Sequence, residues 1–392
     1  MKILYLVHDL SDPAVKRRVN MLRVGGADVV LAGFSRTPHR DGFCLGYTKD
    51  GAFIQRLIMV LICCIRMGRL YQMAKGTDVL IARNLEMLIL GRRLYNLLKR
   101  KKKGTKLVFE CLDIHRLLIS KGLISSILVS VEKWLVKSSK LVITSSPAFI
   151  KNYFDPIAKH KIPYLLLENK LFGLSRDELK NYRSSIFKSK PRQSEGFWTI
   201  GWFGALRCQK SLDILEELCV RLEGKLKIEL RGRPAYSEFR NFEHQVSTSP
   251  FITFLGEYQY PDDLSALYSS VDFTWAIDFF EEGGNSEWLL PNRIYEGGAF
   301  NTVPLYLFST QIADKLQSIG VGVGFHRHEI LMAMNEFFMM LNTDEYISLK
   351  NLSQKIPSEK WVADRSECMK LVVFLESLDS DETLSINHMY EL

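Results

Sequence analysis

The segment "KILYLVHDLSDPAVKRRVNMLRVGGADVVLAGFS" spans residues 2–35 and predicts how the chain folds. Its first apolar run predicts a strand that ends in polar residues. Asp12 is placed to cap the helix that follows, Pro13 stands in the first turn, and a Gly-Gly pair ends the helix. A second apolar run, at 28–35, predicts the next strand. This strand–helix–strand unit is typical of a parallel sheet that helices cover on both faces.

The same alternation runs through the rest of the chain in two series. Strand-like apolar runs recur in the first half at 78–84, 106–113 and 140–146, and in the second half at 199–206, 226–232, 252–258, 272–278 and 302–307. Between the two series, residues 175–196 are polar and have no clean period. We therefore expect an α/β fold of two doubly wound, Rossmann-like domains facing a cleft, in which ligands bind at the carboxyl ends of the strands.

The predicted boundaries follow from this alternation. They are a first domain at 1–172, a linker at 173–196, a second domain at 197–357, and a C-terminal helical segment at 358–392 that packs back across the junction. No apolar run reaches the roughly 18 residues of a membrane span. Seven cysteines show neither C-x-x-C pairs nor histidine partners at metal-ligand spacing, so we expect no disulfide and no structural zinc.

Charge is distributed unevenly along the chain. Residues 1–170 hold 30 Lys and Arg against 12 Asp and Glu, a net charge of +18, whereas the remainder has a net charge of −10. A basic half predicts an anionic partner, such as nucleic acid, an anionic membrane surface or an anionic substrate. Two segments carry much of this charge. Residues 52–76 mix apolar runs with cations, and residues 97–106 are a dense basic run, although a buried helix and a solvated loop are the simpler interpretations.

The stretch "GALRCQKSLDIL" (204–215) has the features of an anion site. A strand ends near Gly204, a helix begins a few residues later, and Arg207 and Lys210 lie between them. Amide groups at a helix N-terminus together with two cations can bind phosphate or diphosphate. The alternative is that both side chains are solvated loop cations. Arg231 follows the next strand, where a surface turn is the simpler interpretation.

A second motif, "LPNRIYEGGAFNTVPL" (290–305), predicts a short helix that starts at a proline and ends at two glycines. A carboxylate at the end of such a helix, here Glu296, can accept hydrogen bonds from both hydroxyls of a ribose. Arg293 either meets phosphates or forms an ion pair with Glu296 at i, i+3 spacing.

Taken together, these motifs resemble the donor domain of GT-B glycosyltransferases of the family 4-like type. The resemblance is carried by "GWFGALRCQKS", "IELRGRP", "FLGEYQYPDDLSALYSSVDFTWAI" and "NSEWLLPNRIYEGGAFNTVPL", in that order. The N-terminal "HDLSDPAVKRRVNMLRVGGADVVLAGF" and "ECLDIHR" narrow it to bacterial exopolysaccharide enzymes of the succinoglycan type. The resemblance covers nearly the whole chain and implies the GT-B fold and a nucleotide-sugar substrate.

By position, Glu296 resembles the ribose-binding glutamate of this family, and Arg207 and Lys210 resemble the cations that hold the donor diphosphate. The implied donor-binding residues are Gly204, Arg207, Lys210, Arg231, Asn285, Ser286, Asn292, Arg293 and Glu296. These cations would neutralise the leaving nucleoside diphosphate, so we expect no metal ion and no other cofactor.

The sequence departs from the retaining members of the family, many of which carry two glutamates eight positions apart. Here Trp288 stands eight positions before Glu296, and Glu287 is out of register. The first loop is Ser11-Asp12-Pro13 instead of a glycine-rich sequence. Both differences favour an inverting reaction, which needs a general base to deprotonate the acceptor hydroxyl.

Three residues are candidates for this base. Asp12 is either the base or only the cap of the first helix. Asp113 and His115, in "ECLDIHR", are the rival pair at the end of a strand, where a histidine near a carboxylate can act as base or bind the acceptor sugar. A metal site there is not expected, because no third ligand has recognisable spacing.

We therefore expect a cytoplasmic glycosyltransferase that is peripheral on the inner face of the plasma membrane. It would transfer a sugar from a nucleotide-diphosphate sugar to a lipid-linked or oligosaccharide acceptor in bacterial exopolysaccharide or capsule biosynthesis, without binding nucleic acid. The alternatives are a GT-B-fold nucleotide-sugar epimerase, and a non-catalytic basic protein that binds membranes or nucleic acid.

Overall fold

The computed structural model describes residues 1–36, 41–49, 53–100, 104–174, 177–179, 196–379 and 389–391. The chain divides into two compact units, Met1–Glu168 with Asp364–Leu392, and Asn169–Ala363. The boundaries therefore fall after residues 168 and 363, compared with the predicted 172 and 357. Most of the predicted linker at 173–196 lies outside the described residues, as do residues 101–103 of the basic run.

The first unit is built on a sheet of eight strands in the order β14-β7-β6-β5-β4-β1-β2-β3. All its neighbouring strands are parallel. The strands are β1 (Lys2–Val7), β2 (Asp28–Ser35), β3 (Phe43–Tyr47), β4 (Val79–Arg83), β5 (Lys106–Cys111), β6 (Leu141–Thr144), β7 (Tyr164–Leu166) and β14 (Met389–Glu391). The central strands are almost wholly buried, because helices cover both faces of the sheet, and this is why they appear in the sequence as unbroken apolar runs.

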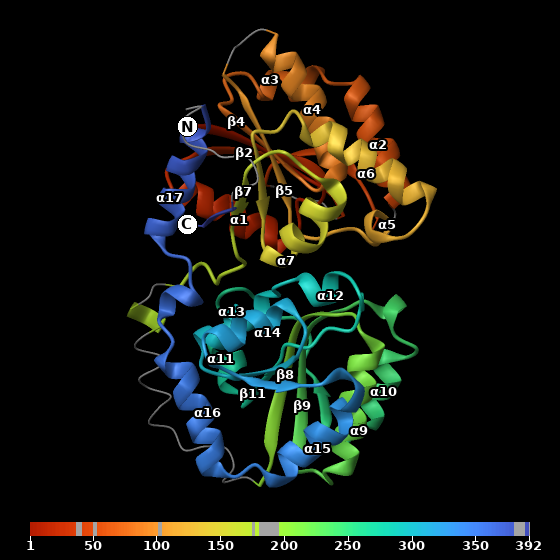
Figure 1. Ribbon diagram of the computed structural model, residues 1–392, viewed down its shortest axis with the longest axis vertical. Coiled ribbons are helices and arrows are strands. Elements are labelled where there is room, and N and C mark those ends of the chain that lie inside the picture. Colours follow the sequence, from red (N-terminus) through yellow and green to blue (C-terminus); the bar gives the residue numbers. More distant parts are fainter. Residues whose placement is uncertain are drawn as a thin grey trace. The chain divides into compact units, whose positions relative to one another are not determined.

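Helices of the first unit connect these strands (Figure 1). They are α1 (Pro13–Val24), α2 (Phe53–Ile65), α3 (Gly68–Met73), α4 (Leu85–Lys99), α5 (Arg116–Ile119), α6 (Leu123–Val136), α7 (Pro147–Phe149), the π-helix η1 (Ile150–Ala158), α17 (Arg365–Glu376) and the turn η6 (Ser377–Asp379). Among the described residues, no helix combines the length and the apolar content that crossing a bilayer requires.

Residues after 363 complete the first unit. In Figure 1 the blue α17 lies beside the red α1, and the helices approach so closely that a Cβ atom on Gly25 would lie 2.3 Å from the carbonyl oxygen of Cys368. Strand β14 pairs with β7. The Nζ atom of Lys106 donates to the carbonyl oxygen of Glu376 at 2.6 Å. The C-terminal segment is therefore an integral part of this unit's core.

The second unit contains a sheet of six parallel strands in the order β10-β9-β8-β11-β12-β13. The strands are β8 (Trp198–Leu206), β9 (Leu226–Pro234), β10 (Ile252–Phe254), β11 (Phe273–Trp275), β12 (Val303–Leu307) and β13 (Val323–Phe325). The helices are α9 (Gln209–Arg221), α10 (Phe242–Thr248), α11 (Leu264–Ser269), α12 (Asn285–Trp288), α13 (Asn292–Ala299), α14 (Gln311–Ser318), α15 (Ile330–Met340) and α16 (Thr343–Lys355), with short turns η3 (Tyr236–Glu238), η4 (Arg327–Glu329) and η5 (Ser358–Lys360). Two parallel sheets with alternating helices confirm the predicted α/β fold class.

The glycine pair in the 290–305 motif has a different role from the one predicted. Both glycines lie inside α13 and do not end it. A Cβ atom on Gly297 would lie 2.6 Å from the Oγ1 atom of Thr274, and one on Gly298 would lie 2.6 Å from the ring of Trp361. The glycines are needed because α13 packs tightly against β11 on one side and against a buried tryptophan on the other.

Candidate active site

The loops that follow β8, β11 and β13 in the second unit bring most of the predicted donor-binding residues together. Gly204 in β8 pairs with Gly232 in β9, at φ values of +103° and +129°. A Cβ atom on Gly232 would lie only 1.9 Å from the carbonyl oxygen of Gly204. The close approach of the two strands therefore requires a glycine at 232, while Gly204 contributes its backbone, at a positive φ that favours glycine, just before the cation-bearing loop.

Arg207 and Lys210 both turn toward the loop after β11. The Nη2 atom of Arg207 lies 3.6 Å from Oδ2 of Asp278, and the Nζ atom of Lys210 lies 2.9 Å from Oε1 of Glu282. Arg207 stacks over the ring of Phe280 at 4.7 Å, and Lys210 lies over a neighbouring ring at 4.5 Å. The two cations are 40% and 49% exposed, so their ion pairs are screened by water and open to exchange with another anion.

Arg293 extends this cation cluster into the interior. Its side chain is buried, and Nη1 donates to the carbonyl oxygen of Trp275 at 3.3 Å. Burial lowers the pKa of Arg293, the carboxylate of Asp278 acts in the opposite direction, and Arg207 lowers the pKa further. Asp278 thus pairs with Arg207 and acts electrostatically on Arg293, and it is also held by Ser286, whose Oγ donates to Oδ1 at 3.0 Å.

Glu296 is 4% exposed, and its Oε2 atom accepts a hydrogen bond from the hydroxyl of Tyr268 at 2.9 Å. Burial raises the pKa of Tyr268 well above its usual value, and the nearby Glu296 carboxylate adds to the rise. Arg293 donates to a backbone carbonyl and Glu296 accepts from a tyrosine, so these two side chains are fixed by different parts of the unit.

The remaining predicted donor residues take part in the loops around this cluster. Asn285 donates to Oε2 of Glu281 at 2.6 Å. Arg231 donates to the carbonyl oxygen of Glu257 at 3.5 Å, and Asn292 begins α13.

Arg327 was missed in the sequence, although it binds two carboxylates in this cluster. Its Nη1 donates to Glu282 at 2.7 Å and its Nη2 donates to Glu287 at 2.9 Å. Glu287, the acidic residue out of register in the motif, is therefore committed to a cation. The signal for Arg327 is its place just after β13, a strand of three residues that the apolar pattern did not reveal.

The first unit has a cavity of about 270 Å³ at the carboxyl ends of β1, β4 and β5. It is lined by polar residues that include His8, Arg56, Asn84, Glu86, Asp113 and His115. Asp113 and His115 are two of the three predicted bases. His8 was not singled out in the sequence, although it directly follows the first strand, which is where ligand-binding residues of parallel sheets lie.

His8 is held beside Asn84, since the Nδ1 atom lies 3.2 Å from the amide nitrogen of Asn84. Asn84 has a φ value of +70°, an unusual conformation for a residue with a side chain. Burial lowers the pKa of His8, and the guanidinium of Arg83 lowers it further, while Asp12 acts in the opposite direction. The imidazole is therefore neutral at neutral pH, the state that a proton acceptor needs.

Asp12 caps α1, as one of its two interpretations predicted. Its Oδ1 atom accepts from the amide of Ala14 at 2.8 Å, and its Oδ2 atom lies 3.4 Å from Nη2 of Arg83. Arg83 also contacts a buried network in which Tyr5 donates to Glu110. Both oxygens of Asp12 are thus engaged, and its position supports the Arg83 side chain.

Asp113 and His115 differ in their surroundings, although both line the cavity. The side chain of Asp113 is exposed, and its backbone oxygen accepts from Cys111. The Nδ1 atom of His115 accepts from the amide of Leu117 at 3.2 Å and so caps α5. Among the described residues, no group of three His, Cys, Asp or Glu side chains is arranged to hold a metal ion.

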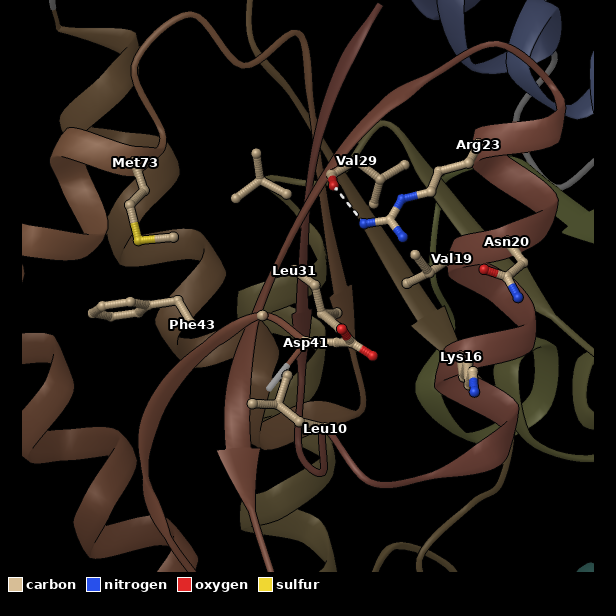
Figure 2. Close-up of a pocket in the computed structure, with 12 residues that line it drawn as sticks. Leu10, Lys16, Val19, Asn20, Arg23, Val29, Leu31, Asp41, Phe43 and Met73 are labelled. Atoms are coloured by element: carbon tan, nitrogen blue, oxygen red, sulfur yellow. Dashed lines mark hydrogen bonds between the residues drawn. The ribbon is translucent and has the colours of Figure 1, made fainter. Parts of the chain in front are cut away.

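A second cavity of the first unit, of about 510 Å³, lies between α1 and the strands β2 and β3 (Figure 2). Its polar lining comes from Lys16, Asn20, Arg23 and Asp41, and Arg23 donates to the carbonyl oxygen of Val29 at 3.4 Å. None of the predicted site residues lines this cavity.

Comparisons with known proteins indicate what this chain resembles. No family model matches it. The succinoglycan biosynthesis protein ExoL of Rhizobium meliloti (strain 1021) is 42% identical over 386 residues, which cover 96% of this chain and 94% of that protein. The structure of Anabaena Alr3699/HepE in complex with UDP and glucose superposes with a TM-score of 0.67 at 15% identity, covering 96% of this chain and 99% of that one. A glycosyltransferase from Rickettsia africae ESF-5 gives a TM-score of 0.65 at 13% identity, covering 97% and 99%.

Proposed function

The chain belongs to the family of the succinoglycan biosynthesis protein ExoL, and we propose that it is a glycosyltransferase that uses a nucleoside-diphosphate sugar in bacterial exopolysaccharide biosynthesis. The predicted resemblance to the succinoglycan type and the GT-B fold are both confirmed by the comparisons. Since Anabaena Alr3699/HepE has been solved with UDP and with UDP-glucose, a uridine diphosphate sugar is the first donor to test.

One observation carries this proposal: helix α13 holds both the buried carboxylate of Glu296 and Arg293. Arg293 extends inward the cation cluster that begins with Arg207 and Lys210 after β8. In the proposal Glu296 accepts the ribose hydroxyls while Tyr268 keeps the carboxylate in place. Arg207 and Lys210, whose side chains are 40% and 49% exposed, exchange their carboxylate partners for the donor diphosphate. Fixed cations aimed at the leaving diphosphate stabilise the charge that develops on it as the sugar departs, so the proposal needs no metal ion.

We propose that the reaction inverts the anomeric centre and that His8 is the general base. A lowered pKa keeps its imidazole neutral, and the cavity it lines also contains Asp113 and His115, which we assign to acceptor hydroxyls. For Nε2 to accept the proton, Nδ1 must carry hydrogen and donate it to the side-chain oxygen of Asn84, whose amide can turn either way. Asp12, whose carboxylate lies against Arg83, then acts by positioning that arginine.

The acceptor is proposed to be a lipid-linked saccharide, which the protein meets as a peripheral protein at the inner face of the plasma membrane. The support is electrostatic, because residues 1–170 carry a net charge of +18 and each Lys or Arg near an anionic surface contributes about 1 kcal/mol of attraction.

The proposed function can be tested in two steps. Purified protein is first titrated with UDP, UDP-glucose, UDP-galactose, GDP-mannose and ADP-glucose by calorimetry, and the donor that binds is then incubated with a synthetic diphosphate-linked saccharide. We expect one nucleoside diphosphate to bind and the product to have the opposite anomeric configuration from the donor, as read by NMR. If none of these donors bound, the glycosyltransferase assignment would be wrong. If the product kept the anomeric configuration of the donor, the inverting mechanism and the assignment of His8 as its base would be wrong, but the glycosyltransferase assignment would stand.

A further inference from the structure

Helix α6 of the first unit exposes a large apolar face, although its buried residues include two polar side chains as well as Leu135 and Val136. Ser125 and Glu132 point inward and are 7% and 2% exposed. Three large apolar side chains point outward, since Leu123, Ile127 and Trp134 are 83%, 61% and 57% exposed. A helix on the surface of a globular protein normally buries the apolar side and exposes the polar side, so this helix calls for an explanation.

Two hydrogen bonds on the inner side hold α6 in this orientation. The hydroxyl of Ser125 donates to the carbonyl oxygen of Leu118 at 2.9 Å. The carboxylate of Glu132 accepts from the hydroxyl of Tyr153 at 2.6 Å. Turning the helix to bury its apolar side would break both bonds and leave buried Tyr153 without this partner, which costs free energy.

The polar groups on the outer side are satisfied within the helix. The hydroxyl of Ser126 donates to the carbonyl oxygen of Gly122 at 3.2 Å, and that of Ser130 donates to the carbonyl oxygen of Ser126 at 2.7 Å. Serines bonded to the preceding turn in this way are compatible with apolar surroundings. Together with Leu123, Ile127 and Trp134 they line a groove of about 390 Å³.

Cations lie at the C-terminal end of this apolar face. The guanidinium of Arg92, on α4, lies 3.5 Å from the ring centre of Trp134. Lys133 and Lys137 are exposed at the same end of α6. Figure 1 shows α2, α4 and α6 on one side of the sheet, and the acidic side chains of these three helices, Glu86 and Glu132, are both buried. An apolar face with a tryptophan and cations at its border has the chemistry of a membrane interface.

We propose that the outer face of α6 docks the first unit onto a lipid bilayer containing anionic phospholipids. Leu123, Ile127 and Trp134 insert at the boundary of the acyl chains, and Lys133 and Lys137 meet the phosphates of the headgroups. This inference rests on the membrane association proposed above and gives it a specific surface. A second copy of the chain is a poorer occupant, because a two-fold contact would bring this cation-rimmed face against itself without an exposed carboxylate from these helices to pair with.

The test is flotation of the purified full-length chain with vesicles of phosphatidylcholine alone or mixed with phosphatidylglycerol. One variant combines Leu123→Ser with Ile127→Ser. Its matched control combines Val220→Ser with Val373→Ser, which remove apolar side chains that are 58% and 61% exposed elsewhere. Since each inserted side chain contributes about tenfold to partitioning, we expect the α6 variant to bind mixed vesicles about a hundredfold more weakly, and the control to bind as wild type does.

Thermal unfolding and UDP affinity are measured for each variant to check that it is folded. If wild type binds mixed vesicles and the α6 variant binds equally well, α6 is not the docking surface and the inference fails, while membrane association stands. If wild type binds neither kind of vesicle, both the α6 inference and the proposed membrane association are wrong. Transfer to a soluble acceptor then still tests the glycosyltransferase assignment. If light scattering shows a wild-type dimer that the α6 variant abolishes, a second copy covers this face and the inference is overturned.

Discussion

Replacing Glu296 with glutamine tests the ribose site with little change in shape. The amide can keep its oxygen toward Tyr268 and so preserve the hydrogen bond that Glu296 accepts there at 2.9 Å. It then presents an NH₂ group where the second carboxylate oxygen stood. Because ribose hydroxyls that donated to an anion now meet a donor, we expect Glu296→Gln to bind UDP more weakly while its unfolding free energy changes by no more than about 1 kcal/mol.

The size of the effect follows from the bonds that are lost. A hydrogen bond to a charged group is worth about 1.5–3 kcal/mol. Losing one such bond fully and weakening the other reduces UDP affinity by about 2–3 kcal/mol, which is a factor of about 30 to 150. Calorimetric titration of wild type and Glu296→Gln with UDP measures this directly.

A thermodynamic cycle with 2′,3′-dideoxy-UDP tests whether the weaker binding comes from lost contacts with the ribose hydroxyls. Wild type should prefer UDP over the dideoxy compound by a similar factor, and Glu296→Gln should bind the two almost equally. Tyr268→Phe serves as the control, because it removes the partner that holds the carboxylate but keeps the anion, so most of the preference for ribose should remain. If Glu296→Gln still discriminates between the two nucleotides as wild type does, Glu296 does not bind the ribose.

Three further predictions concern other parts of the molecule. His8→Gln should lower kcat by about 10² to 10⁴ without changing UDP affinity, and near-normal turnover would exclude His8 as the base. Folding lowers the pKa of His8, so as pH falls the unfolded chain takes up this proton before the folded protein does. The acid limb of kcat/KM should therefore lie below about pH 6.5. Below that pH His8 should lower the free energy of unfolding increasingly, a trend in urea unfolding that His8→Gln removes. Arg207→Ala should weaken UDP binding by about tenfold or more and uridine binding much less. Equal losses of affinity for the two compounds in calorimetry would show that Arg207 does not bind the diphosphate. Gly232→Ala should lower the free energy of unfolding in urea by at least about 3 kcal/mol, because its Cβ would lie 1.9 Å from the oxygen of Gly204. The control Gly26→Ala, whose Cβ would meet nothing within 4 Å, should lower it by about 1 kcal/mol. Similar losses for the two variants would contradict the close strand approach.

Parallel strands were predictable because their burial on both faces leaves continuous apolar runs in the sequence. The first apolar run of the chain and the runs at 28–35 and 199–206 coincide with β1, β2 and β8 to within a few residues. The three-residue edge strands β13 and β14 were not predicted, whereas β10, an edge strand of the same length, lies within the predicted run at 252–258. The position of Arg327 went unrecognised with β13.

Contacts between distant residues explain what the site motifs alone did not reveal. Asp12 looks the same in the sequence whether or not Arg83, 71 positions away, lies beside it. Glu296 is fixed by Tyr268, 28 positions earlier. The glycines of α13 suggested a helix end because local propensity favours it, but the packing of Thr274 and Trp361 against them decides their role.

The return of residues 364–391 to the first unit has a consequence for biosynthesis. During translation, β1 to β7 leave the ribosome early, but their sheet lacks β14 and their α1 lacks its packing partner α17 until the whole second unit has been made. Asn169–Ala363 is continuous and can complete its own core first. The unit that begins the chain therefore finishes folding last, and during that interval its surface beneath α17 is open to chaperones.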